Sequence, residues 1–546
     1  MSFAAIREAV THFSSLTFLL FAAVVVLVCR LLPKRARWVW LLAASLAFYA
    51  AGDWWYLPFL AASVLSTWGL ALLIGKQAAR DEAALTAARS TLSKDERKAL
   101  KASQKKKRAR LLWVGLVFNF GLLCVLKYTD FVLEGVSGIA SLWGAGPIRP
   151  LDLILPLGIS YYTFRSTAYL IDVFRGKTEA QPNPARYALF ISFFPAVVQG
   201  PICRYNETAA QLLEPRDADW TDFSAGLLRL LWGYFKKLVV ADTAMTAVRA
   251  IVSDPERLNG AYAAVLIVVY SAVIYGDFTG GMDISLGLSR MMGITLTENF
   301  NRPFSSMNTE EYWNRWHITM GSYFTDYVFY PMSISKPMQR LTVWGRARLG
   351  NGIGMRLPVY LATIITWFLT GLWHGASWNF IVWGLLNGAV ILISRECKPL
   401  YARFHKRFPG AKENRFYQAF CRVRTFLLMG AIRSLDCYRD VGVTFRAFGS
   451  IFTRPGTYAE LFNGQALEAL GLPVASWIML LAAVVVLWLV GRAGDRKKPA
   501  GWQVAEPLSD KPLRWALVCG ALLLVILLAG QYGIGFDASD FIYNRF

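Results

Sequence analysis

The sequence predicts an all-α protein that crosses a membrane many times. Hydrophobic residues make up 55% of the 546 residues and charged residues only 17%, whereas soluble domains carry roughly 25% charged residues. Apolar runs long enough to cross a bilayer, which takes about 20 mostly apolar residues, recur along the chain. The basic residues gather in the short connections between these runs, as the positive-inside rule describes.

The apolar runs indicate about 11 to 13 membrane helices, with shorter buried segments between them. The run at 190–201 is short, and we expect it to be re-entrant. The runs are residues 15–32, 38–52, 57–75, 111–127, 151–173, 190–201, 223–240, 261–275, 357–373, 378–394, 475–490 and 513–529.

The net charge of +22 arises from 58 basic and 36 acidic residues. Residues 76–110 alone hold 12 basic and 4 acidic residues, so we expect this stretch to be cytoplasmic, and the N-terminus and C-terminus to lie outside. We expect it to form a basic helix along the inner membrane surface. It is either an anchor that sets the topology or a docking site for an acidic partner. This distribution gives no support to nucleic-acid binding.

The charge and hydropathy patterns divide the chain into five segments. N-terminal membrane helices occupy 1–75, and the basic cytoplasmic linker occupies 76–110. A membrane core follows at 111–394. A second basic linker at 395–424 leads to the C-terminal membrane helices at 425–546.

A polar stretch between 277 and 332 interrupts the membrane pattern, and the last of its polar motifs is the run at 311–317, which ends with His317. Irregular polar backbone is tolerated at membrane depth only when it is buried in protein or lines a wet cavity. Trp313, Asn314 and His317 are three or four residues apart, which predicts a shared helical face. The pattern fits an oriented imidazole in a pocket, and it also fits a histidine in an aromatic belt at the membrane interface.

His374 follows an apolar run and precedes another. An ionisable group between membrane helices is costly and marks a functional site, although packing at a helix end is the alternative. Imidazole can take a proton from a hydroxyl and return it to a leaving group. Gly371 and Gly375 permit close approach of backbone or substrate at this position.

The other histidines and the cysteines suggest no further site. His12 lies near a terminus and His405 lies in a basic loop. Seven scattered Cys residues form no C-x-x-C pair, so we predict neither a metal site nor a disulfide framework.

Several short motifs occur between about residues 151 and 388. They are the Leu-Pro-Leu-Gly-Ile-Ser-Tyr-Tyr-Thr-Phe run at 155–164, Gly200-Pro201, Phe235-Lys236-Lys237 with Ala241-Asp242, Asp277-Phe278 with Gly280 and Asp283, the Glu-Asn-Phe-Asn-Arg-Pro run at 298–303, Tyr312-Trp313 through Trp316-His317, and Trp373-His374-Gly375-Ala376. Together they resemble the membrane-bound O-acyltransferase family, most closely its bacterial alginate O-acetyltransferase and teichoic-acid D-alanyl transfer branch.

The resemblance implies a funnel or tunnel of tilted helices in a bacterial cytoplasmic membrane, with His374 and His317 as catalytic residues. It also implies no permanently bound cofactor. The co-substrate is an acyl thioester presented from the cytoplasm, either acetyl-CoA or a phosphopantetheine carrier protein. An extracytoplasmic glycan or a secreted acyl-relay protein would accept the acyl group. The residues predicted to line the site are Asn314, Trp313, Trp373, Asp277, Asp283 and Asn301.

We therefore predict an enzyme, an O-acyltransferase that modifies an extracytoplasmic polysaccharide or cell-wall polymer, with acetyl as the favoured group. In this scheme His374 is the general base, and His317 with Asn314 positions or stabilises the thioester carbonyl. The alternatives are D-alanyl transfer toward teichoic acid and, in another class, a transporter or lipid-handling protein. Thr325 and the segment 331–337 depart from the alginate branch, so the acceptor polymer stays open.

Overall fold

The structure is a computed structural model in which the described residues are almost entirely helical. Their contacts divide the chain into two compact units. Unit 1 contains Met1–Asp222 and Leu288–Leu296, and unit 2 contains Phe223–Gly287 and Thr297–Phe546. The described residues are 9–144, 146–254, 257, 260–454, 457–461, 467–493 and 511–532.

Seven helices among the described residues are long and apolar enough to cross a membrane, which confirms the predicted all-α membrane class. Two shorter apolar helices add to these. The predicted total of 11 to 13 stays a prediction, because several apolar runs form short or bent helices. The seven are Tyr56–Ala87, Lys94–Ser141, Gly260–Met291, Leu357–His374, Trp378–Glu396, Val474–Arg492 and Pro512–Ala529.

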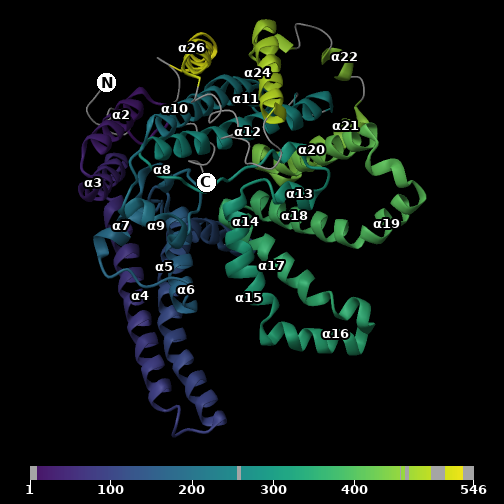
Figure 1. The fold of residues 1–546 in the computed structure, drawn as a ribbon. Coiled ribbons are helices and arrows are strands. Elements are labelled where there is room, and N and C mark those ends of the chain that lie inside the picture. Colours follow the sequence, from purple (N-terminus) through teal and green to yellow (C-terminus); the bar gives the residue numbers. More distant parts are fainter. Residues whose placement is uncertain are drawn as a thin grey trace. The chain divides into compact units, whose positions relative to one another are not determined.

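Unit 1 is built around a long antiparallel helical hairpin, formed by α4 and α5 (Figure 1). The 48 residues of α5 span about 72 Å at 1.5 Å per residue, far more than the roughly 30 Å of a hydrocarbon core. The helices of this unit are α2 Leu16–Leu31, α3 Lys34–Gly52, α4 Tyr56–Ala87, α5 Lys94–Ser141, α6 Ile159–Arg175, α7 Pro184–Ser192, α8 Phe194–Val197 and α9 Tyr205–Leu213.

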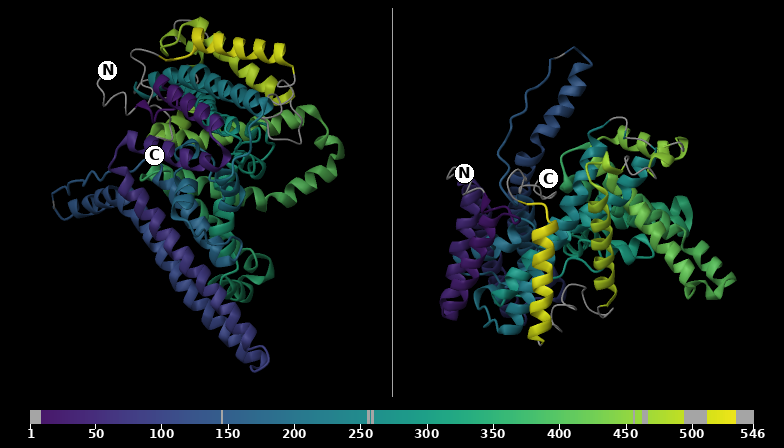
Figure 2. Two further views of the ribbon diagram at one scale, coloured as in Figure 1. Left: turned by 60° about the vertical axis from the view of Figure 1, so that its left-hand side comes forward. Right: turned by 90° about the horizontal axis from the view of Figure 1, so that it is seen from above.

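The basic stretch at 76–110 forms the polar end of this hairpin and not a helix of its own. The prediction of a separate helix along the membrane surface is therefore wrong. Its residues continue α4 and begin α5 because Ala, Lys, Arg and Glu are strong helix formers. The polar ends of the two helices also lie side by side in a second view (Figure 2, left).

A buried carboxylate fastens the polar end of the hairpin. Asp81 on α4 is 5% exposed, and its Oδ2 lies 3.1 Å from Nε of Arg108 on α5. Gln77 donates to Asp81 Oδ1 at 2.8 Å. At the turn, Ser93 and Glu96 form a reciprocal capping box that starts α5. The basic residues of 76–110 thus lie on two helices that are joined by side-chain contacts.

The run at 190–201 does not form one helix. It contains the end of α7, the single-turn α8 and a buried extended stretch. Gly158 begins α6 nearby with φ of 69°, and a Cβ there would lie 2.2 Å from the carbonyl oxygen of Val197. This close approach explains the glycine within the 155–164 run.

Unit 2 contains both candidate histidines. Most residues of α10 and α12 belong to it. Its elements are α10 Trp220–Tyr234, the π-helix η1 Phe235–Ala241, α11 Asp242–Val252, α12 Gly260–Met291, η3 Pro303–Ser305, α13 Thr309–Trp313, α14 Ile318–Phe324, η4 Thr325–Phe329, α15 Tyr330–Ser333, α16 Lys336–Gly354, α17 Leu357–His374, α18 Trp378–Glu396, α19 Lys398–Arg407, η5 Pro409–Lys412, α20 Arg415–Tyr438, α21 Val441–Thr453, α22 Thr457–Leu461, α24 Val474–Ala493 and α26 Pro512–Ala529.

Within unit 2, α10 packs against α12 backbone to backbone. A Cβ built on Gly233 would lie 2.7 Å from the carbonyl oxygen of Gly280, and one on Gly280 would lie 2.9 Å from that of Gly233. Small residues at helix contacts permit this approach in membrane proteins.

Ion pairs then join α12 to α10 and to η1. Arg229 Nε lies 2.6 Å from Asp283 Oδ1, and its terminal nitrogens lie 3.0 Å from the two Glu298 oxygens. Lys237 Nζ lies 2.7 Å from Asp277 and 2.8 Å from Asp242. Every one of these groups is buried or nearly so, and a buried charge is tolerated when it is paired in this way.

We expect Gly280→Leu to destabilise unit 2, because its side chain would meet the α10 backbone. Overpacking of this kind costs about 1–3 kcal/mol. Thermal unfolding of the detergent-solubilised protein measures this. Gly121→Leu is the matched control, because a Cβ on this α5 glycine meets nothing within 4 Å. Equal stability of the two variants would contradict the close packing.

Candidate active site

His374 is the last residue of α17, where the α17–α18 hairpin turns. It is 4% exposed. Its ring centroid lies 4.6 Å from the ring of Trp383 on α18 and 4.9 Å from that of Trp373. The imidazole is therefore surrounded by aromatic side chains.

Glycines bring α18 against the end of α17. A Cβ on Gly371 would lie 2.3 Å from the carbonyl oxygen of Phe380, and one on Gly375 would lie 2.3 Å from the Phe380 ring. The close approach expected at these glycines is thus made by Phe380. This contact fixes the backbone on both sides of His374.

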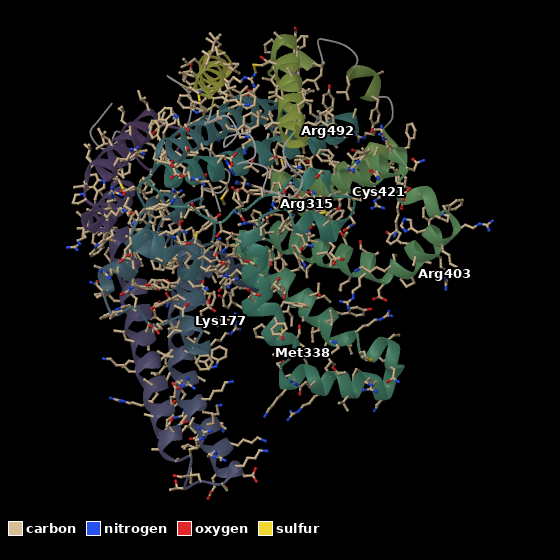
Figure 3. The ribbon with its side chains drawn as sticks, in the orientation of Figure 1. Lys177, Arg315, Met338, Arg403, Cys421 and Arg492 are labelled. Carbon is tan, nitrogen blue, oxygen red and sulfur yellow. The ribbon has the colours of Figure 1, made fainter. Side chains whose placement is uncertain are left out.

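His317 lies in the link between α13 and α14, and not on a helix. It is fully buried and has left-handed backbone angles, with φ of 50° and ψ of 53°. The predicted helical face shared by Trp313, Asn314 and His317 is therefore wrong, because α13 ends at Trp313. Arg315 lies in the same link, between the ribbons of α13 and α14 (Figure 3).

A short antiparallel pairing fixes the link. The N–H of Asn301 donates to the carbonyl of Arg315 at 2.9 Å, and the N–H of Ile318 donates to the carbonyl of Asn299 at 2.9 Å. Phe300 and Trp316 form the only isolated β-bridge among the described residues. The polar stretch is thus anchored to the Glu-Asn-Phe-Asn-Arg-Pro run at 298–303.

Asn299 also contacts His317 through its side chain. His317 Nδ1 lies 3.2 Å from Asn299 Oδ1. The same oxygen accepts from the backbone N–H of Thr319 at 2.9 Å and from its hydroxyl at 3.0 Å. Asn299 is completely buried.

The two histidines meet at one tryptophan. The ring centroid of Trp373 lies 5.9 Å from that of His317 and 4.9 Å from that of His374. Phe278 of α12 lies against the other side of His317 at 4.8 Å, in an edge-on arrangement. His317, His374 and Trp373 therefore lie within one aromatic cluster.

Arg433 of α20 contributes the nearby charge. It is 7% exposed, and its guanidinium carbon lies 5.2 Å from the ring centroid of Trp316 and 5.0 Å from that of Trp383. Burial, together with the Arg433 charge, lowers the pKa of His317 to about 3. His317 is therefore neutral at physiological pH.

Trp313 belongs to the same aromatic cluster, since its ring lies 5.8 Å from that of Trp383 and 4.6 Å from that of Trp367.

The remaining predicted lining residues have other surroundings. Asn314 is exposed and caps α13 through its backbone. Asn301 holds the link through its backbone N–H. Asp277 is bound to Lys237, whereas Asp283 borders a small cavity beside the site.

That cavity has a volume of about 50 Å³. Asn299 and Phe300 line it together with the ion-paired residues Arg229, Asp283 and Glu298. The buried ion pairs therefore extend to the residue that contacts His317. Within the described part of the chain, no group of three or more His, Cys, Asp or Glu residues could hold a metal ion.

Sequence reasoning missed two residues of the site, Asn299 and Arg433. Asn299 lies 18 residues before His317 and reaches it only through the antiparallel pairing, which has no periodic signal. Arg433 did carry a signal, because a buried cation in an otherwise apolar helical stretch is typical of functional sites.

Residues 176–343 match the sequence profile described as MBOAT, membrane-bound O-acyltransferase family. A Pseudomonas putida protein named probable alginate O-acetylase AlgI is 31% identical over 550 residues, 98% of this chain and all of the relative. A Helicobacter pylori peptidoglycan O-acetyltransferase is 30% identical over 406 residues, 69% of this chain and 67% of the relative.

A Bacillus subtilis teichoic acid D-alanyltransferase is 28% identical over 286 residues, which cover 51% of this chain and 67% of the relative. The profile match includes His317, and the full-length similarity to the Pseudomonas putida protein extends across His374. The chain belongs to the membrane-bound O-acyltransferase family.

Proposed function

We propose that the protein transfers an acetyl group from a cytoplasmic thioester to a hydroxyl of an extracytoplasmic polysaccharide or cell-wall polymer, directly or through a partner protein. The observation that carries this proposal is the meeting of two buried histidines at Trp373. Acyl transfer to a hydroxyl needs a base, a stabiliser of the carbonyl charge and exclusion of water. A buried, aromatic-walled histidine pair supplies the base and the exclusion.

In this proposal His374 is the general base that takes the proton of the acceptor hydroxyl. His317 is the second group that contacts the reactants. Asn314, which the sequence placed beside His317, receives no role because its side chain is exposed. Trp373 separates and orients the two rings.

The donor is an acyl thioester, either acetyl-CoA or a phosphopantetheine carrier protein. The polar end of the α4–α5 hairpin supports a cytoplasmic approach, because basic residues outnumber acidic ones 12 to 4 at 76–110. The same rule places both termini outside a bacterial cytoplasmic membrane. The acyl donor then has no need to cross the bilayer.

D-alanyl transfer toward teichoic acid is the second candidate, and the Bacillus subtilis relative supports it. That similarity covers 51% of this chain, whereas similarity to the relatives named acetylases covers up to 98%. Acetyl is therefore favoured. Mass spectrometry of surface glycans from cells with and without the protein distinguishes the two, because acetyl and D-alanyl esters differ in mass.

We expect His374→Ala to lower acyl transfer on the order of 10²–10⁴-fold, which is the usual contribution of a general base. The ester content of the surface glycan measures this, with membrane insertion checked by immunoblotting. His405→Ala is the control, because His405 contacts Tyr417 away from the site. Full transfer by a correctly inserted His374→Ala protein would exclude the assigned role.

His317→Ala should impair transfer by a smaller factor and leave the protein inserted, because His374 and its aromatic surroundings persist. Steady-state kinetics with a purified acyl thioester and a polysaccharide acceptor measure this. Unchanged kinetics would remove His317 from the mechanism without removing His374.

A further inference from the structure

We propose that Asn299 is a positioning residue that fixes the proton of neutral His317 on Nδ1. His317 then presents the lone pair of Nε2 to the reactants and acts as a hydrogen-bond acceptor for a hydroxyl of the acceptor. This inference rests on the proposed function for its chemical meaning. The proton position itself can be measured without any activity.

The orientation of the Asn299 amide is determined by Thr319. The backbone N–H of Thr319 can only donate, and it points at the Asn299 side chain with a separation of 2.9 Å. The atom that it meets must therefore be the amide oxygen and not the amide nitrogen. The Thr319 hydroxyl, at 3.0 Å from the same atom, is consistent with this orientation.

The tautomer of His317 follows from that orientation. Its Nδ1 lies 3.2 Å from an oxygen that can only accept, so Nδ1 must carry a hydrogen. A neutral imidazole has one ring N–H, and Nε2 is then the unprotonated nitrogen. The hydrogen bond of one ring nitrogen thus decides the chemistry of the other.

Asn299 also fixes the position of the ring. Its carbonyl accepts from the N–H of Ile318, directly after His317. The left-handed backbone angles of His317 are strained for a residue with a Cβ, and this pairing holds them. Phe278 closes one side of the ring at 4.8 Å. One residue therefore constrains both the backbone and the imidazole.

This tautomer changes the role that the sequence suggested for His317. Stabilising the negative charge on a thioester carbonyl requires an N–H directed at that oxygen. Neutral His317 has no such hydrogen on Nε2, and its cationic form is disfavoured by burial and by Arg433. Nε2 of His317 therefore accepts a hydrogen bond from a hydroxyl group of the acceptor molecule, and His374 carries out the proton transfer.

Nitrogen-15 NMR of histidine-labelled protein in detergent tests the proton position directly. The chain has only four His residues, so the signals of His317 can be assigned by their loss in His317→Gln. We expect a protonated, pyrrole-type Nδ1 and an unprotonated, pyridine-type Nε2 in the wild-type protein. A proton on Nε2 of neutral His317 would overturn the proposal, whether or not the protein transfers acyl groups.

The activity of Asn299→Asp tests the acceptor role. The carboxylate keeps the oxygen that Thr319 and His317 need, and its negative charge raises the pKa of His317 by at least about one unit. Below the raised pKa, Nε2 is protonated and can no longer accept. We therefore expect the activity of Asn299→Asp, divided by that of the wild type at the same pH, to fall as the pH is lowered, because protonation of His374 is common to both proteins and cancels in this ratio.

The opposite result would show that His317 acts as a donor. If Asn299→Asp keeps or gains activity as the pH falls, a protonated Nε2 is productive and the proposal is wrong. Arg433 on α20 and His374 beyond Trp373 lie near His317, and the ion-paired Arg229, Asp283 and Glu298 border the cavity that Asn299 lines. None of these groups is changed in this variant. Asn351→Asp is the control for an added carboxylate, since the side chain of Asn351 accepts a hydrogen bond from Arg346 on the exposed surface of α16.

Discussion

Buried polar groups in unit 2 must find their partners within the protein, and this requirement organises the site. A charge or amide left unpaired at low dielectric costs more free energy than most packing contacts return. Arg229 therefore binds both Asp283 and Glu298, and the residue after Glu298 is Asn299. The ion-paired residues Arg229, Asp283 and Glu298 therefore line the same cavity as Asn299, whose side chain contacts His317.

Glycines make these short polar contacts geometrically possible. Gly233 and Gly280 let α10 approach α12 until main chain meets main chain, so that side chains on adjoining turns can form ion pairs. Gly371 serves the same purpose for α17 and α18, where the close approach surrounds His374 with the rings of Trp373 and Trp383. The same close helix packing thus permits both the buried ion pairs and the aromatic surroundings of His374.

The sequence could predict what depends on local pattern. The apolar runs indicate membrane helices, and His374 and His317 stand out because ionisable groups are rare in such a chain. The helical face of His317 could not be predicted correctly, because Asn299 holds that link by an antiparallel pairing between segments 18 residues apart. The basic stretch was misplaced because helix propensity, which carries α4 and α5 beyond their apolar portions, outweighed its charge pattern.

The two histidines share a tryptophan but differ in their surroundings, and this difference is what a two-histidine mechanism requires. His374 lies at a helix end among aromatic rings, at a turn where glycines permit close contact with Phe380. His317 is held by an amide oxygen on one ring nitrogen, with a fixed cation on the neighbouring helix. Two imidazoles with equivalent surroundings would compete for one proton. Because burial and Arg433 lower the pKa of His317 and make it a weak base, while Asn299 fixes its hydrogen on Nδ1, the proton of the acceptor hydroxyl is left to His374.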